Sequence, residues 1–197
     1  MKNQEKEEKN GIQEKGIMEQ VEETLLKSRR ILLNDAVDSK ITGELIRKFW
    51  YLDLKLPGEP ILFIINSPGG SVDAGFAIWD QIKMLQSPVA TLVTGLAASM
   101  GSVLSLVAPK GMRFSTPNAR FMIHQPLISG VIQGQATDLG IQAKQMIVMR
   151  EKLIQLYHEA TGKNPDEIRK AIDRDTWLSA QEAKQFGLID EIVNSYS

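Results

Sequence analysis

Two short apolar runs constrain the fold of this chain more than any other feature. ILFII (residues 61–65) and VATLV (residues 89–93) are each followed by a turn of small residues and then by a helical pattern. Nearly continuous apolar runs of this length are typical of strands that are buried on both faces of a parallel sheet. The order strand, helix, strand, helix therefore predicts an α/β fold with a parallel core.

The composition excludes several classes of function. The 197 residues suffice for one domain with a substantial core. A net charge of −1 gives no electrostatic reason to expect nucleic acid or a membrane surface as a partner, so we expect neither. No apolar run reaches the ~18 residues of a membrane span, so we expect a cytoplasmic protein.

Few residues are available for thiol or metal chemistry. The chain has no cysteine, which excludes disulfides, thiol nucleophiles and thiolate metal sites. Its two histidines, His124 and His158, make a histidine-rich metal site unexpected. We therefore predict no metal.

The N-terminus differs in character from the rest. Residues 1–15 are almost wholly polar, so they bury too little apolar surface to offset the entropy of ordering. We expect a disordered or removable tail over residues 1–16 and a single domain over residues 17–197. Ile17, Val21 and Leu25 recur every four residues and predict that the domain begins with a short amphipathic helix.

Further elements follow from periodicity and from turn residues. RILL (residues 30–33) is typical of a strand, and Asp38 or Ser39 could cap the helix that follows it. Other expected helices cover residues 71–86, 138–160, 164–172 and 179–187. The turn TPN separates two short strand-like pieces before His124, and a final strand follows Gly187.

The stretch GLAASMGS (residues 95–102) contains the first candidate for chemistry. It connects an apolar strand to a helical pattern, and its small residues permit a sharp turn that presents Ser99. Such a junction resembles a nucleophile elbow, although alanine stands at the first glycine position of G-x-S-x-G. Helix capping by Ser99 is the alternative, and the stretch alone leaves both open.

A serine nucleophile needs a base and an acid. His124 ends a strand-like segment and is the natural base, whereas His158 lies on the polar side of a long helix and fits a structural role. AIDRDTW (residues 171–177) offers Asp173 and Asp175 as the acid, and composition does not choose between them. NSPGG (residues 66–70) is either an oxyanion cradle of backbone N–H groups or a plain turn.

Five motifs together resemble the ClpP peptidases, the proteolytic subunits of ATP-dependent Clp proteases. They are INSPGG (residues 65–70), AASMG (97–101), MIHQP (122–126), GQATD (134–138) and EAKQFGLID (182–190). The likeness spans residues 30–193. It implies a ClpP/crotonase-type α/β fold of repeated strand–helix units, with a protruding helical handle at about residues 125–160.

The resemblance also implies the roles of particular residues. Ser99 matches the family's nucleophile, His124 its general base and Asp175 its acid, which makes Asp173 the weaker choice. The oxyanion hole falls on the backbone N–H groups of Gly70 and Met100. The implied activity is that of a serine endopeptidase, with no cofactor bound by this chain because the partner ATPase uses the ATP.

The family implies an assembly as well. Its members stack heptameric rings into a tetradecamer, and an AAA+ unfoldase of the Clp type feeds unfolded polypeptide into the chamber. Gln135, Asp138 and Arg174 match polar residues that link the rings. The segment before Arg30 does not match the usual N-terminus, which leaves open a ring of this chain alone or one mixed with a paralogue. A non-catalytic assembly subunit and a crotonase-type acyl-CoA enzyme are the alternative functions.

Overall fold

The structure is a computed structural model that describes residues 16–127 and 134–195. The tail expected over residues 1–16 lies outside the described residues except for Gly16. Residues 128–133, on the approach to the expected handle, also lie outside them. Neither the tail nor the single-domain prediction is therefore tested.

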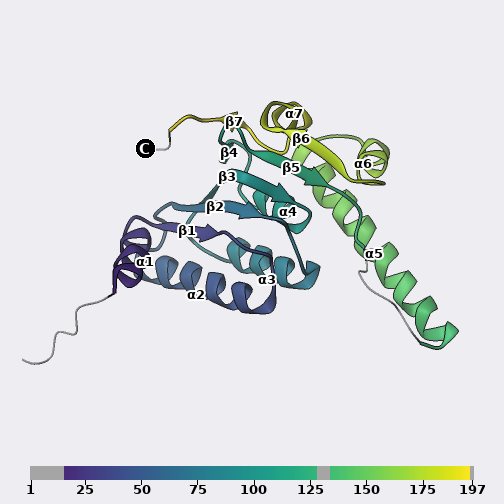
Figure 1. The fold of residues 1–197 in the computed structure, drawn as a ribbon, viewed down its shortest axis with the longest axis horizontal. Helices are drawn as coiled ribbons and strands as arrows, with labels where there is room; N and C mark the ends of the chain where they lie inside the picture. The colour runs from purple at the N-terminus through teal and green to yellow at the C-terminus, as the bar shows by residue number, and fades with distance from the viewer. Residues whose placement is uncertain (1–15, 128–133, 196–197) are drawn as a thin grey trace, which may run out of the picture.

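The described residues form a sheet of mostly parallel strands, as the apolar runs predict (Figure 1). Its main path has the order β1-β2-β3-β4-β7, and β3 also pairs with β5 further along its length. β6 adds an antiparallel partner to β5. The strands are β1 (Arg30–Leu33), β2 (Ile61–Ser67), β3 (Val89–Ala98), β4 (Arg113–Ser115), β5 (Arg120–Ile123), β6 (Thr176–Ser179) and β7 (Glu191–Ile192).

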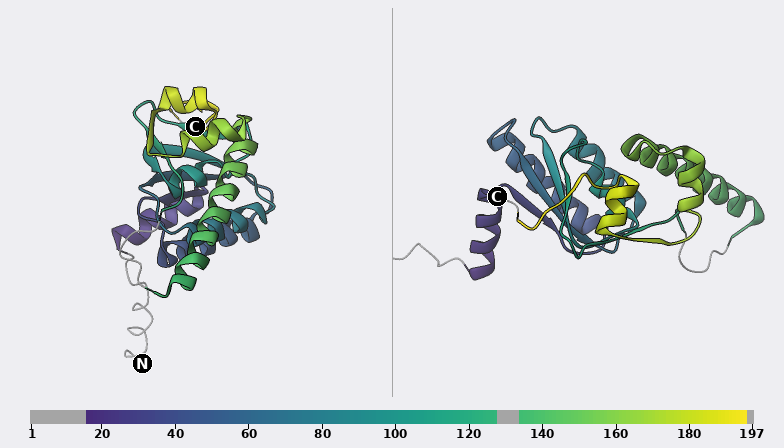
Figure 2. Two further views of the ribbon diagram at one scale, coloured as in Figure 1. Left: turned by 90° about the vertical axis from the view of Figure 1, so that its right-hand side faces the viewer. Right: turned by 90° about the horizontal axis from the view of Figure 1, so that it is seen from above.

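Helices pack against this sheet, and one of them extends well away from it. Figure 1 and the right-hand view of Figure 2 show that α5 protrudes from the body as a handle. The helices are α1 (Ile17–Lys27), α2 (Ser39–Lys55), α3 (Val72–Lys83), α4 (Met100–Ser105), α5 (Ala136–Thr161), α6 (Pro165–Ala171) and α7 (Ala180–Phe186). This mixed α/β architecture with a handle confirms the predicted fold class.

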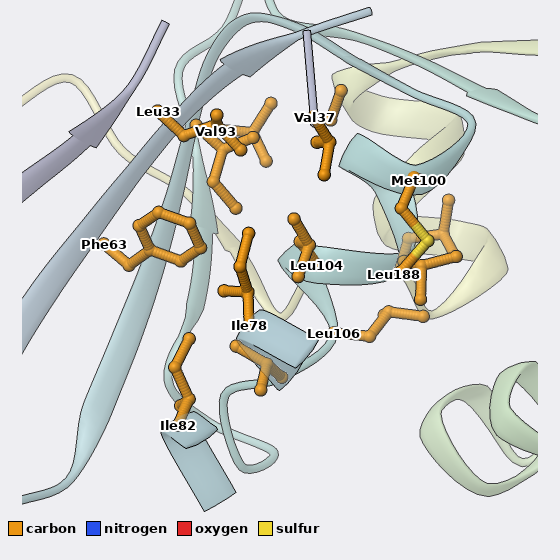
Figure 3. Close-up of a cluster of buried hydrophobic side chains, with 14 of the residues drawn as sticks. Leu33, Val37, Phe63, Ile78, Ile82, Val93, Met100, Leu104, Leu106 and Leu188 are labelled. Carbon is orange, nitrogen blue, oxygen red and sulfur yellow. The ribbon is translucent and has the colours of Figure 1, made fainter. Parts of the chain in front are cut away.

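The main core lies between the sheet and its helices. Figure 3 shows Phe63 and Val93 of the sheet, Ile78 of α3 and Leu104 of α4 turned toward one another. All four side chains are fully buried. Burial of one such side chain contributes roughly 1.5–3 kcal/mol, so this cluster fixes α3 and α4 against β2 and β3.

Local capping signals place the helix ends close to expectation. Asp38, rather than Ser39, caps α2 by accepting a hydrogen bond from the Ile41 N–H at 2.8 Å. Ser71 caps α3, which ends at Lys83 and so is shorter than the predicted 71–86. A complete capping box at Ser179 begins α7, and Gly187 ends it in the left-handed conformation.

Two elements around the site differ from expectation. β3 does not stop at Val93 but continues through Ala98, because Leu96–Ala98 find partners in β5 and Ala97 pairs with Ser67 of β2. The expected turn of small residues is therefore strand as far as Ala98. The second element, β6, was not foreseen, since TWLS shows no clear alternation and its pairing partner lies far away in the sequence.

Candidate active site

Ser99 alone forms the turn between β3 and α4. Its backbone has φ 53° and ψ −121°, and only Arg29 shares a positive φ among the non-glycine residues of the described ranges. A non-glycine residue in this region is strained, as the serine of a nucleophile elbow is. The Ser99 N–H donates to the Met122 carbonyl at 2.8 Å, which ties the turn to β5.

The capping alternative for Ser99 is wrong. Its side chain makes no capping hydrogen bond to α4. Instead, Ser99 Oγ lies 2.7 Å from Nε2 of His124. The serine therefore starts the helix with its backbone, and its hydroxyl is free to face the histidine.

His124 and Asp175 meet because two strands pair in one register. His124 directly follows β5 and Asp175 directly precedes β6, and the antiparallel pair Ile123↔Thr176 brings these ends together. His124 Nδ1 lies 3.1 Å from Asp175 Oδ1. Since the carboxylate can only accept, Nδ1 carries the proton, and Nε2 is left to accept from the Ser99 hydroxyl.

The competing residues lie elsewhere or point away. Asp173 offers its backbone carbonyl to the Gln125 amide at 2.9 Å, and its carboxylate lies 3.8 Å from Arg174 Nη1. His158 donates from Nδ1 to the Lys163 carbonyl near the end of α5, which fits the structural role expected for it. The structure thus brings Ser99 together with His124 and Asp175, and leaves both competitors out.

The NSPGG turn lies directly against the Ser99 elbow. Gly70 has φ 147°, and a Cβ there would overlap the Val37 carbonyl. The Val37 N–H donates to the Gly69 carbonyl and the Ser71 N–H donates to the Val37 carbonyl, each at 2.8 Å. These two hydrogen bonds hold the segment and do not use the Gly70 N–H. Glycine is required because no side chain fits this close approach.

Met100 supplies the second candidate N–H. It is the first residue of α4, and the first N–H groups of a helix have no acceptor within that helix. A Cβ on Gly69 would meet Ser99 and the Met100 nitrogen, so the glycine turn and the start of α4 are in direct contact. Gly70 and Met100 as oxyanion donors stay a prediction.

Ser99 and His124 open into a cavity of about 500 Å³. Gly70 also lines this cavity, and an apolar wall is formed by Val72 of α3, by Leu127, which follows β5, and by Leu153 of α5. Sequence reasoning did not find this wall, because its residues come from segments with no shared motif. A cavity that combines such a wall with a hydroxyl and an imidazole suits an extended organic substrate.

The ring-contact candidates do not meet in one chain. Gln135 precedes α5 and Asp138 lies in its first turn, at the end of the helix farthest from the sheet (Figure 1). Arg174 is highly exposed, and its Nη1 donates to the Asp173 carbonyl at 3.0 Å. Any link between Arg174 and the start of α5 would therefore need a second copy.

Residues 16–127 and 134–195 contain neither a cluster of metal ligands nor a helix that could span a membrane. No group of three or more potential ligand side chains (His, Cys, Asp, Glu) gathers in these ranges, while the absence of metal stays a prediction. Over the same ranges, no helix combines the length and apolarity that crossing a bilayer would require.

The chain is similar in sequence to known proteins. The sequence model of the Clp protease family matches residues 13–196. A protein of Protochlamydia amoebophila (strain UWE25), named ATP-dependent Clp protease proteolytic subunit 1, is 66% identical over 178 residues, which cover 90% of this chain and 86% of that protein.

Two further relatives carry similar names. The ATP-dependent Clp protease proteolytic subunit 1 of Chlamydia muridarum is 59% identical, over 90% of this chain and 92% of that protein. The ATP-dependent Clp protease proteolytic subunit of Bdellovibrio bacteriovorus is 46% identical, over 87% of this chain and 81% of that protein. With a family match along nearly its whole length and relatives this similar, the chain belongs to the Clp protease family.

Proposed function

We propose that this peptidase is a serine endopeptidase that uses Ser99 as its nucleophile, His124 as its general base and Asp175 as the acid. The observation that carries the proposal is one continuous run of contacts, from Ser99 Oγ to His124 Nε2 at 2.7 Å and from His124 Nδ1 to Asp175 at 3.1 Å. Both distances are those of hydrogen bonds. They suit a serine made nucleophilic by an oriented imidazole.

The chemistry follows from these contacts. His124 takes the Ser99 proton as the serine oxygen attacks the peptide carbonyl carbon, and Asp175 stabilises the imidazolium. The N–H groups of Gly70 and Met100 donate to the oxyanion, and each such donor is worth roughly 10²–10³ in rate. The intermediate collapses as His124 returns the proton to the leaving amine. Water, deprotonated by His124, then hydrolyses the acyl-enzyme, so the reaction needs no cofactor bound by this chain.

Two alternatives are less well supported. A crotonase-type acyl-CoA enzyme also stabilises an oxyanion with two N–H groups, but it has no use for a serine hydrogen-bonded to a histidine and a carboxylate. A non-catalytic assembly subunit has no need of a serine and a histidine that line a cavity together, with a carboxylate hydrogen-bonded to the histidine. The strain at Ser99 likewise favours catalysis, because backbone strain is concentrated at functional sites.

The proposal extends to assembly. Several large apolar side chains are exposed on α5, namely Leu139, Ile141, Ile147 and Val148. Exposed apolar surface of this kind marks contact sites between proteins. We propose that such contacts pair two heptameric rings into a tetradecamer, made of this chain alone or together with a paralogue.

Within this assembly, an AAA+ unfoldase of the Clp type would feed unfolded polypeptide to the active sites. The names of the relatives support an ATP-dependent partner. Because that partner consumes ATP, we assign the assembly to the cytoplasm.

Labelling with a serine-reactive fluorophosphonate tests the catalytic proposal. The assembled wild-type protein should be labelled and should hydrolyse a fluorogenic peptide, whereas Ser99→Ala should do neither. Ser115→Ala is the matched control, because Ser115 is a buried serine in β4, outside the cavity. An assembled wild-type protein that is neither labelled nor hydrolytic would favour the assembly subunit instead.

A further inference from the structure

A buried pair of hydroxyls connects the handle helix to the nucleophile turn. Ser102 Oγ donates to the Ser99 carbonyl at 2.7 Å and lies 2.9 Å from the Tyr157 hydroxyl. Ser102 belongs to α4 and Tyr157 to α5, and both side chains are almost completely buried. The contact therefore links two segments that are 55 residues apart in the chain.

The direction of these hydrogen bonds follows from counting protons. A serine hydroxyl has one proton, and Ser102 donates it to the Ser99 carbonyl. Tyr157 must therefore donate to Ser102 Oγ. Burial raises the pKa of Tyr157 to about 12, although the hydrogen bond with Ser102 acts in the opposite direction. Tyr157 thus stays a donor throughout the neutral range.

The acceptor of this relay belongs to the proposed oxyanion hole. The Ser99 carbonyl and the Met100 N–H are the two ends of one peptide unit, which is planar and trans, so fixing one end fixes the other. The N–H groups of Ser102 and Val103 also donate to the Ser99 carbonyl, at 3.0 and 3.3 Å. Of the donors to this carbonyl, only the Ser102 hydroxyl is itself held by another element.

We propose that Ser102 and Tyr157 are positioning residues that hold the Ser99–Met100 peptide unit so that the Met100 N–H faces the oxyanion. This inference rests on the proposed function. Ser99 has a strained backbone, and such a conformation persists only where surrounding contacts determine it. The hydroxyl relay supplies one of these contacts from α5.

The same part of α5 also lines the substrate cavity. Leu153 forms part of the cavity wall and stands one turn before Tyr157 on the helix. A displacement of the sheet-proximal end of α5 would therefore move the cavity wall and loosen the oxyanion donor together. The carboxyl end of α5, which carries both residues, is the end that lies next to the body of the molecule (Figure 1).

The test compares Tyr157→Phe and Ser102→Ala with wild type in assemblies of equal size. Each variant should lower kcat/KM on a fluorogenic peptide by about tenfold, a fraction of the 10²–10³ that a whole oxyanion donor provides. Each should also weaken inhibition by a peptide boronate by the same factor, because its tetrahedral adduct with serine occupies the oxyanion hole. The affinity for a product peptide from the leaving-amine side, which places no carbonyl or carboxylate oxygen in the oxyanion hole, should not change.

Matched controls separate positioning from general stability. Ser105→Ala removes a buried serine whose hydroxyl donates to the Ser102 carbonyl rather than to Ser99. Tyr51→Phe changes a half-exposed tyrosine on α2. Both should keep the wild-type boronate affinity. The inference would be overturned if the controls lost as much boronate affinity as Tyr157→Phe and Ser102→Ala, or if these two variants kept the wild-type affinity. In either case an active wild type would still uphold the proposed function. An inactive wild type would instead overturn the proposed function.

Discussion

Ile123 and Thr176 face each other across the antiparallel pair of β5 and β6. Ile123 directly precedes His124 and Thr176 directly follows Asp175, so this register brings the two triad residues side by side. A slip of one residue would turn the side chains of β6 to the opposite face. The geometry of the site therefore depends on the pairing of two four-residue strands.

The first prediction concerns the choice of carboxylate. Asp175→Asn should lower kcat by about 10⁴, because an amide can stabilise the wrong imidazole tautomer and cannot balance the imidazolium charge. Asp173→Asn is the matched control and should stay close to wild type, because the Asp173 contact to Gln125 uses the backbone carbonyl. Peptide hydrolysis measures both. Equal losses in the two variants would contradict the assignment.

The second prediction concerns the glycine turn. Gly70→Ala should reduce kcat/KM by about 10²–10³, because the new Cβ overlaps the Val37 carbonyl and displaces a proposed oxyanion donor. Gly58→Ala is a suitable control, since Gly58 also has a positive φ of 83° but faces open space. Both variants incur backbone strain, so a similar fall in activity for both would argue against the donor role of Gly70.

The third prediction concerns ring pairing. Arg174→Ala should yield separated rings with reduced peptidase activity, if contacts of Arg174 with Gln135 and Asp138 of a second copy align the triad. Analytical ultracentrifugation measures the size of the assembly and peptide hydrolysis the activity. Arg169→Ala, which breaks an ion pair with Glu151 inside the chain, should keep the double ring. Intact double rings with full activity in Arg174→Ala would refute the hypothesis.

The fourth prediction concerns alkaline stability. The pKa of Tyr157 is about 12 in the folded protein and 10.0 for an unperturbed tyrosine. As pH rises, the unfolded state loses the Tyr157 proton before the folded state does. The contribution of the protonated tyrosine to the free energy of unfolding is therefore complete below pH 10 and falls as pH rises toward 12. The expected loss is about 1.4 kcal/mol per pH unit over that window. Denaturant unfolding of Tyr157→Phe should lack this component, and identical pH profiles for the two proteins would refute it.

Much of the fold was predictable because its signals are local. The apolar runs of β2 and β3 are read from consecutive residues, and so is a helix cap at Asp38 or Ser39, of which the structure uses Asp38. β6 was missed because its strand state depends on pairing with β5 and not on its own sequence pattern. The end of β3 was misjudged for the same reason, since partners in β5 extend it to Ala98.

The sequence by itself determined the parallel α/β core, a serine on a strand-to-helix turn and a histidine at the end of a strand. From the residues alone, the choice between Asp173 and Asp175 stayed open until the family resemblance favoured Asp175. Only the tertiary structure decided that Asp175 meets His124 and that Tyr157 reaches the nucleophile turn. The physical reason is that these contacts join residues about fifty positions apart, whose distance is set by strand register and helix packing.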